Sequence, residues 1–342
     1  MKKLLKILLI LVCFSTVQLQ GQDLNFSQFY EMPLLRNPAL AGIYKGDVRA
    51  TSAYRSQWAS VTVPYKTVAV GVETKFGISQ NTDDYLSVGL QVTNDIAGDS
   101  KLGKTQILPM VAMHKILNNT NSGYLTLAFM GGPVQQRFDP SGLKFDDQFV
   151  NGAYSALNPT RQVFNNTNVT YWDPSVGLSF SNILGYDTKF YAGVGYFHFL
   201  KPRVAFSSIN DIRLNPKLTL NVGCNTMLGD MDRLILYLDY FMQGGNNQAQ
   251  GGFMVKHDFI QDGEEESLAF SAGGFYRWND ALMPVIKLDY YSLGIGVSYD
   301  INMSKLRTAS TYRGGLEVTV SYKSFLNIRN SSLQKMRCVV PF

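Results

Sequence analysis

The chain has 342 residues, of which 45% are apolar, 13% aromatic and only 17% charged. Soluble proteins average about 25% charged residues, so this deficit favours a membrane protein. The net charge of +5 is spread along the sequence, without a basic arm or an arginine/aromatic patch, which argues against nucleic acid as a partner. Beyond the N-terminus, no apolar run approaches the roughly 18 residues that a spanning helix needs.

Residues 1–21 have the pattern of a secretory signal peptide. Lys2, Lys3 and Lys6 precede the apolar run Ile7–Phe14, and a polar region follows, which predicts cleavage before Gln22. Cys13 lies in the apolar run, but it follows a valine where a lipid-attachment site needs a small residue. Removal of the signal would leave two cysteines, in a strand and in the tail, so we expect no disulfide framework.

Residues 22–46 do not form a strand. Pro33, Pro38 and Gly42 interrupt the segment, and its apolar and polar residues alternate without a clear period. Two interpretations stay open: an ordered lead-in packed at the mouth of a barrel or inside it, and a docking segment that faces periplasmic machinery.

From Asp47 onward, the sequence predicts about fourteen strands separated by breaks rich in Gly, Asn and Asp. Most have about the 9–11 residues that a tilted strand needs to cross a bilayer. Pro109 lies inside the fourth strand, which weakens that assignment. The strands are expected at 48–57, 65–76, 85–95, 104–116, 122–136, 172–181, 188–199, 217–227, 232–242, 250–258, 267–277, 282–288, 291–301 and 312–322.

Apolar residues occupy every second position in several of these strands. In the strand near 65–76, Val68, Val70 and Val72 alternate with small or polar residues, and the same period recurs across 291–301 and 312–322. A period of two indicates a strand with one face in an apolar medium and the other in a polar one. Alternation is poor in 122–136 and 188–199, which we therefore expect to be covered on the inner side by a loop or by the N-terminal segment.

The connections between the strands alternate in length. If the N-terminus is periplasmic, connections after odd-numbered strands face outward, and these include the two longest, 137–171 and 200–216. Short periplasmic turns, long outer loops and an even strand count are usual in outer-membrane barrels. The sequence therefore predicts an all-β protein, a transmembrane antiparallel β-barrel of about 14 strands spanning 47–323 with a tail at 324–342, in preference to a large soluble β protein.

Candidate chemical sites are weak. The three histidines lie in different strands without metal-ligand spacing, and no catalytic motif is present, so we expect neither a metal site nor an enzyme. Asp139, Asp146 and Asp147 do not match an EF-hand-type calcium loop. Charged residues on the non-lipid face could line a channel or pair inside a filled barrel. The aromatic-rich stretch 138–172 suits recognition of a protein surface, or packing into the lumen.

Three stretches carry a family resemblance. The first is FSQFY at 26–30 with NPALAG at 37–42, the second YRSQW at 54–58, and the third SYDIN at 298–302 with RGGLE at 313–317. Together they resemble the PorP/SprF family of type IX secretion system outer-membrane proteins from Bacteroidetes. Leu40 replaces the tyrosine usual in the family, and the ending CVVPF departs from the usual CPRF.

The resemblance implies an integral protein of the Gram-negative outer membrane without enzymatic activity or cofactor. Its implied partners are a secreted protein with a type IX C-terminal sorting domain, such as a gliding adhesin, and other secretion components at the outer membrane and periplasm. The alternatives are a passive channel or porin and, less favoured, a barrel enzyme. The motif positions are the candidate partner-binding residues, with a purely structural role as the competing interpretation: Asn37, Pro38, Gly42, Arg55, Gln57, Trp58, Asp300, Asn302, Gly314, Gly315 and Glu317.

Overall fold

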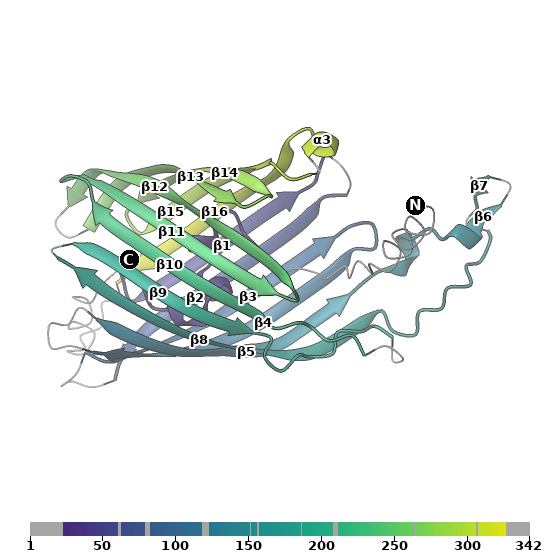
Figure 1. Cartoon of the computed structure of the whole chain (residues 1–342), viewed down its shortest axis with the longest axis horizontal. Coiled ribbons are helices and arrows are strands. Elements are labelled where there is room, and N and C mark those ends of the chain that lie inside the picture. The colour runs from purple at the N-terminus through teal and green to yellow at the C-terminus, as the bar shows by residue number, and fades with distance from the viewer. Residues whose placement is uncertain are drawn as a thin grey trace, which may run out of the picture.

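A computed structural model describes residues 23–325, apart from residues 61–62, 79–82, 118–122, 151, 156, 186, 208–210, 263–264 and 306. Fourteen strands form one closed antiparallel barrel in which neighbours in sequence are neighbours in space, and β1 pairs with β16 to close it (Figure 1). The barrel strands are β1 (Val48–Gln57), β2 (Tyr65–Gly77), β3 (Tyr85–Ala97), β4 (Leu102–Ile116), β5 (Tyr124–Arg137), β8 (Asn168–Leu184), β9 (Thr188–Phe197), β10 (Lys217–Met227), β11 (Asp232–Gln243), β12 (Asn246–Asp262), β13 (Glu265–Arg277), β14 (Ala281–Tyr290), β15 (Leu293–Asn302) and β16 (Arg313–Ser324).

All fourteen predicted strands are confirmed, with differences at their ends. The strand predicted from Tyr291 begins instead at Leu293, because Tyr291 has a positive φ of 48° and forms the turn from β14. Pro109 does lie within β4. Its missing N–H falls where the β4–β5 pairing is interrupted, between Gln106 and Met110.

The two faces of the barrel wall have the polarity expected in a bilayer. In β2, Val68, Val70 and Val72 are 41–45% exposed on the outer surface, whereas Thr67 and Glu73 face inward and are buried. Burying these polar groups inside is favourable only if they find partners there. The outward apolar side chains instead match the hydrocarbon of a membrane.

The two ends of the barrel differ. At the long-loop end, the connection between β5 and β8 carries η3 (Pro140–Gly142), η4 (Asp146–Gln148) and the hairpin β6 (Phe149–Val150) and β7 (Ala153–Tyr154), while α3 (Arg307–Ser310) lies between β15 and β16. The short-turn end, at the left in Figure 1, carries the connections after the even-numbered strands of the predicted series. None of the described helices is both long and apolar enough to cross a membrane.

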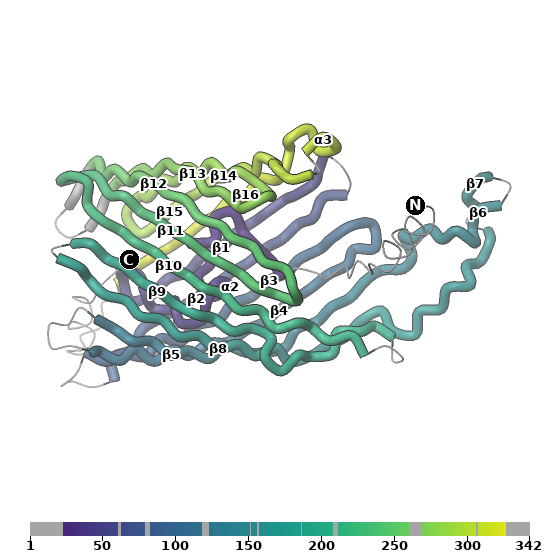
Figure 2. Tube along the Cα trace, in the orientation of Figure 1, coloured from purple at the N-terminus to yellow at the C-terminus, as the bar shows by residue number. Residues whose placement is uncertain are grey.

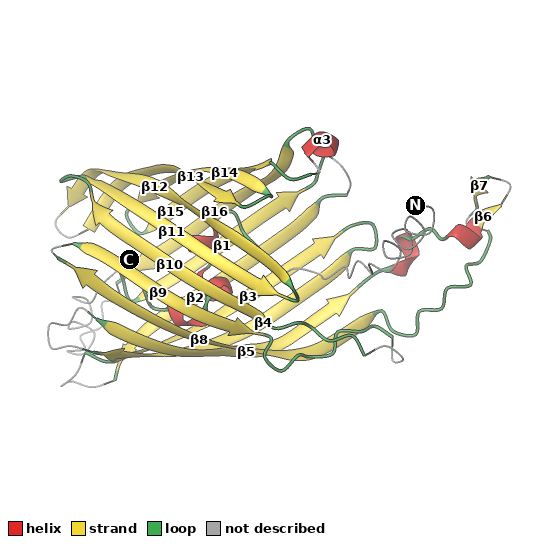
Figure 3. Cartoon of the chain, viewed as in Figure 1, coloured by secondary structure: helices red, strands yellow, loops and turns green. Residues whose placement is uncertain are grey.

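Residues 23–47, here the lumenal segment, lie inside the barrel. Their short helices η1 (Phe29–Glu31), α2 (Pro33–Arg36) and η2 (Pro38–Leu40) appear among the strands in Figure 3, and the tube in Figure 2 shows the purple chain crossing the interior. Pro33 and Pro38 each occupy a first helical position, where the missing N–H does no harm, and Pro38 prevents α2 from continuing beyond Asn37. The segment therefore lies inside the barrel, as the first of the two interpretations expected, and its docking to periplasmic machinery stays a prediction.

Apolar contacts with the lumenal segment explain the strands whose alternation is poor. On β5, Ala128 and Met130 face inward and pack with Leu34 and Ala39 of the segment. On β9, the inward-facing Tyr191 packs in a similar cluster with Leu40, the last residue of η2, and with Ile43 just after it. These strands have apolar residues on both faces because one face contacts lipid and the other contacts the segment.

Candidate functional site

Three of the sequence-predicted residues meet in one buried charge network. Arg55 on β1 donates from Nη2 to Asp300 Oδ2 at 2.6 Å, and its Nε lies 3.8 Å from Glu317 Oε2. All three side chains are at most 3% exposed. The pairing of β1 with β16 places Arg55 opposite Glu317. The pairing of β15 with β16 places Asp300 opposite Gly315, two residues from Glu317, so the closure of the barrel assembles this network.

The same network holds the start of the lumenal segment. The two carboxylate oxygens of Glu317 accept hydrogen bonds from the backbone N–H groups of Ser27 (2.8 Å) and Gln28 (2.7 Å). The Ser27 hydroxyl donates to Asp300, and the Gln28 side chain accepts from Thr319 at 2.7 Å. Hydrogen bonds to charged groups are about twice as strong as neutral ones, so motifs far apart in the sequence fix one another.

The second motif in the segment forms η2, which packs against β5, β8 and β9, and a turn that contacts β2 and β3. Asn37 caps η2 by accepting from Ala39 N at 2.9 Å, and Pro38 begins that helix. Gly42 has a φ of +71° and donates its N–H to Glu73 at 2.9 Å. A Cβ on Gly42 would lie 2.1 Å from Ser87 Oγ, so both the conformation and the space require glycine.

The remaining predicted residues lie at or near the long-loop end. The Gln57 amide, with its oxygen oriented toward Arg55, accepts from that guanidinium, and Trp58 N donates to Gly314 O at 3.0 Å. Asn302 donates to Ser310 Oγ at 2.8 Å and so anchors the connection that contains α3. Gly314 and Gly315 lie where the backbones of adjacent strands approach closely. The structure thus gathers Arg55, Asp300 and Glu317 together with Gln57, and leaves the other predicted residues in separate structural positions.

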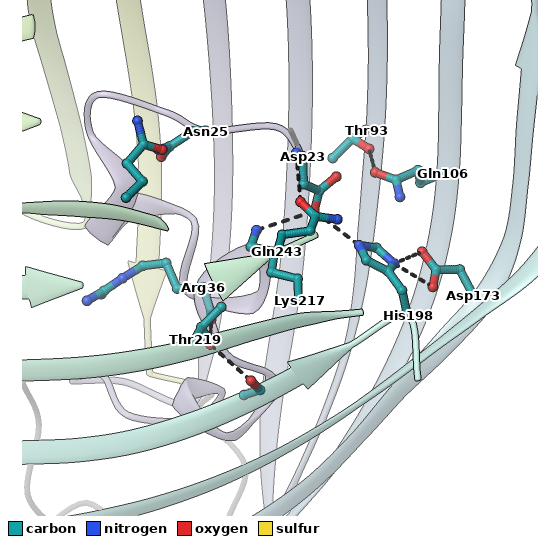
Figure 4. A network of polar contacts seen from close by, with 12 residues as sticks. Asp23, Asn25, Arg36, Thr93, Gln106, Asp173, His198, Lys217, Thr219 and Gln243 are labelled. Atoms are coloured by element: carbon teal, nitrogen blue, oxygen red, sulfur yellow. Dashed lines mark hydrogen bonds and ion pairs between the residues drawn. The ribbon is translucent and has the colours of Figure 1, made fainter. Parts of the chain in front are cut away.

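Sequence reasoning missed a second network, which holds Asp23 at the long-loop end (Figure 4). Asp23 pairs with Lys104 at 3.0 Å and with Lys217 at 3.3 Å, and its Oδ2 lies 3.5 Å from His198 Nε2. His198 Nδ1 in turn contacts Asp173 Oδ1 at 2.7 Å. None of these residues belongs to a motif, and no periodic signal relates them, because they meet only when the barrel closes.

In this second network, charged and hydrogen-bonding partners outweigh the effect of burial on the pKa values of Asp23 and His198. Burial alone would raise the pKa of Asp23, but Lys104 and Lys217 outweigh it and hold that pKa well below its usual value. Burial alone would lower the pKa of His198, but hydrogen bonds with Asp173 and Asp23 raise it above its usual value. A charged Asp23 and a protonated His198 therefore stabilise each other at the start of the segment.

Further ion pairs hold the segment along its length. Arg36 forms a bidentate pair with Asp239 at 2.6 and 2.8 Å, and Lys287 lies 2.6 Å from Glu31. Buried ions are expensive to desolvate, and removal of one partner typically costs about 3–5 kcal/mol because the other stays uncompensated. The segment is thus attached to the wall by charges that neither side can leave unpaired.

Groups considered as chemical sites have ordinary structural partners. His114 lies between Ser87 (3.0 Å) and Thr126 (2.8 Å) in the wall. In the long connection, Asp139 accepts from the backbone and side chain of Ser141, which lowers its pKa. Within the described part of the chain, no group of three or more His, Cys, Asp or Glu side chains could hold a metal ion.

The connection at 138–167, here the aromatic arm, extends away from the barrel (Figure 1). At its base, Phe138 contacts Phe164 and Phe206 with ring centroids 5.4 and 4.8 Å apart. Apolar side chains along the returning part of the arm are open to solvent: Leu157 is 92% exposed and Val163 81%. The arm thus combines a packed aromatic base with uncovered apolar side chains.

Comparisons with solved structures return outer-membrane barrels of low similarity. The translocator domain of the autotransporter NalP from Neisseria meningitidis has 10% identity, a TM-score of 0.41, and coverage of 86% of this chain and 96% of that one. The CymD monoaromatic hydrocarbon channel has 12% identity, a TM-score of 0.47, and coverage of 89% and 95%. A Pseudomonas aeruginosa FadL homologue has 8% identity, a TM-score of 0.48, and coverage of 84% and 92%.

A search of curated proteins finds no match. The family model described as type IX secretion system membrane protein PorP/SprF matches residues 18–322. This range contains the lumenal segment, nearly all of the barrel and every motif that forms the Arg55 network. The chain therefore belongs to the PorP/SprF family of type IX secretion system membrane proteins.

Proposed function

We propose that this protein is a non-enzymatic outer-membrane barrel that supports secretion or surface anchoring of a partner with a type IX C-terminal sorting domain, such as a gliding adhesin. The partner docks at the long-loop end, which faces the cell surface, and the short-turn end faces the periplasm. The observation that carries the proposal is a barrel filled by its own N-terminal segment together with an aromatic arm that leaves apolar side chains uncovered.

The filled lumen supports docking over the alternative of a passive channel. Glu31, Arg36 and Asp23 are each paired with wall residues at distances of 3.0 Å or less. A diffusing solute would have to displace a segment held by several buried ion pairs. A barrel whose interior is occupied in this way is better suited to present its loops than to conduct.

The aromatic arm supports the choice of docking surface. Exposed apolar side chains in an aqueous loop are unfavourable unless a partner covers them, and interfaces commonly concentrate such residues. Phe149 and Tyr154, packed on each other with centroids 5.8 Å apart, are 51% and 37% exposed in the β6–β7 hairpin at the far end of the arm (Figure 1).

The experiment is an affinity purification of the tagged protein from its native outer membrane in mild detergent, read by mass spectrometry. A Leu157→Asp/Val163→Asp variant places charges on the arm, and the matched control Leu228→Asp alters an exposed leucine at the short-turn end. We expect the wild type and the control to retain a large secreted protein with a type IX C-terminal domain. Loss of a central apolar contact should reduce recovery by about tenfold or more in the arm variant.

Two results would contradict the proposal. One is recovery of the barrel with no secreted partner from the native membrane. The other is equal recovery of the partner by the wild type and by the arm variant, which would move the docking surface elsewhere.

A further inference from the structure

A cavity of about 550 Å³ lies between the lumenal segment and the wall at the short-turn end. Its lining reaches the turn at Tyr291 and Ser292 and also Phe325, which follows the last strand. On the inner side it is bounded by Tyr30 and Glu31 of the segment. This volume falls within the range of about 300–1,000 Å³ that is usual for ligand sites.

The lining is strongly cationic. It includes three arginines and five lysines, against the two carboxylates of Glu31 and Asp289. The arginines are committed to carboxylates at 2.6–2.7 Å, in Asp239, Glu73 and Asp187. The lysines come from the segment and from four different strands: Lys45, Lys189, Lys256, Lys287 and Lys323. Lys287 is paired with Glu31 at 2.6 Å, whereas Lys189 and Lys256 lie farther from their carboxylates, at 3.9 Å from Asp187 and 3.5 Å from Asp258.

Tyr30 and Lys323 on the lining have unused binding capacity. Tyr30 is only 7% exposed, and its buried hydroxyl has no hydrogen-bond partner among the described residues. Among the described residues, Lys323 has no carboxylate oxygen within 4.0 Å. A buried hydroxyl without a partner is unfavourable, so a ligand that supplied an acceptor would be stabilised.

The distribution of charge indicates an extended polyanion. Lys256, Lys287 and Lys323 lie near Asp289, whereas Lys189 and Lys45 are contributed by β9 and by the segment, so the positive charge is spread more widely than one phosphate needs. The chain's own tail is a poor occupant, because residues 326–342 contain two arginines and one lysine and no Asp or Glu.

We propose that this cavity binds an acidic peptide segment, one rich in Asp and Glu, of a partner protein on the short-turn side of the membrane. The carboxylates of the peptide contact the lysines, and the Tyr30 hydroxyl donates to one of them. Only the assignment of that side to the periplasm rests on the function proposed above. Binding itself does not depend on the aromatic arm, so failure of either proposal leaves the other testable.

The test measures fluorescence anisotropy of a fluorescein-labelled hexaglutamate peptide added to the full-length protein in detergent. Hexaglutamine of the same length serves as the uncharged control peptide. We expect saturable binding of hexaglutamate only, with affinity that falls as salt is raised, because added ions screen these charges. In Lys189→Gln/Lys323→Gln, affinity should fall about tenfold or more, whereas Lys201→Gln at the long-loop end should leave it unchanged.

Several outcomes would overturn the proposal. They are absence of saturable hexaglutamate binding, equal affinity in the double variant and the wild type, and displacement of the peptide by inorganic phosphate at equal concentration. Much tighter binding after removal of residues 326–342 would also overturn it, since the tail would then be the occupant. Heat-dependent migration on electrophoresis verifies that each variant is folded, and Lys323→Gln alone provides a milder second variant.

Discussion

Replacing Glu317 with Gln should loosen the lumenal segment without emptying the barrel. The side chain is 1% exposed, and its two oxygens accept from Ser27 N and Gln28 N. Glutamine has nearly the same shape, so no cavity forms. It offers only one acceptor oxygen, and its NH₂ group would face the other backbone N–H.

The expected loss of local stability in the Glu317→Gln variant follows from these two hydrogen bonds. An orphaned buried donor costs about 1–3 kcal/mol, and a hydrogen bond to a charged acceptor contributes about 1.5–3 kcal/mol. Allowing for partial relaxation, we expect the free energy of local opening at Ser27 and Gln28 to fall by about 2–4 kcal/mol. Because about 1.4 kcal/mol corresponds to a factor of ten, amide exchange there should accelerate by about 30- to 700-fold.

Hydrogen–deuterium exchange with mass spectrometry measures this directly in peptides that cover residues 24–32. The matched control is Asp95→Asn, since Asp95 accepts its hydrogen bond from Thr67 within the wall. The control should leave exchange of the segment unchanged. Unchanged exchange in a folded Glu317→Gln variant would refute the idea that this network anchors the segment.

Three further predictions test separate parts of the structure. Gly42→Ala should destabilise the segment by about 1–3 kcal/mol and accelerate its amide exchange, whereas Gly152→Ala, with a φ of +78° and open space around it, should not. Val70→Arg on the lipid face should lower the free energy of unfolding by about 2–4 kcal/mol in denaturant titrations in lipid vesicles. The pKa of His198 is raised, so its stabilising effect is complete below the unfolded value of about 6.5 and is lost as pH rises through the folded pKa. The pKa of Asp23 is lowered, so its effect is present above the unfolded value of about 3.9 and is lost as pH falls through the folded pKa. His198→Gln should abolish the alkaline loss of segment protection seen by hydrogen exchange and keep the acid loss.

The barrel could be predicted from sequence because a strand that separates lipid from a polar interior repeats every two residues. Val68 and Glu73 reveal their faces locally, without knowledge of any partner strand. The number of strands and the length asymmetry of their connections then fix the topology. The ends of strands were harder to predict from the sequence, as at Tyr291, because a single residue with a positive φ decides where a turn begins.

The position of the lumenal segment could not be derived in the same way. Its residues have no period, and their partners, such as Glu317 for Ser27 and Asp239 for Arg36, lie 290 and 203 residues away in sequence. Poor alternation on β5 and β9 gave the indirect signal that something covers their inner faces. The family motifs pointed to the Arg55 network, whereas the Asp23 network carries no motif and emerged only from the geometry.

Single-channel recording of the purified full-length protein in planar lipid bilayers tests the central claim most directly. With the lumenal segment held by the Arg55 and Asp23 networks, we predict no sustained conductance for the wild type. Stable ohmic conductance of the wild type, of the size expected for an open 14-stranded pore, would contradict the account and favour a channel.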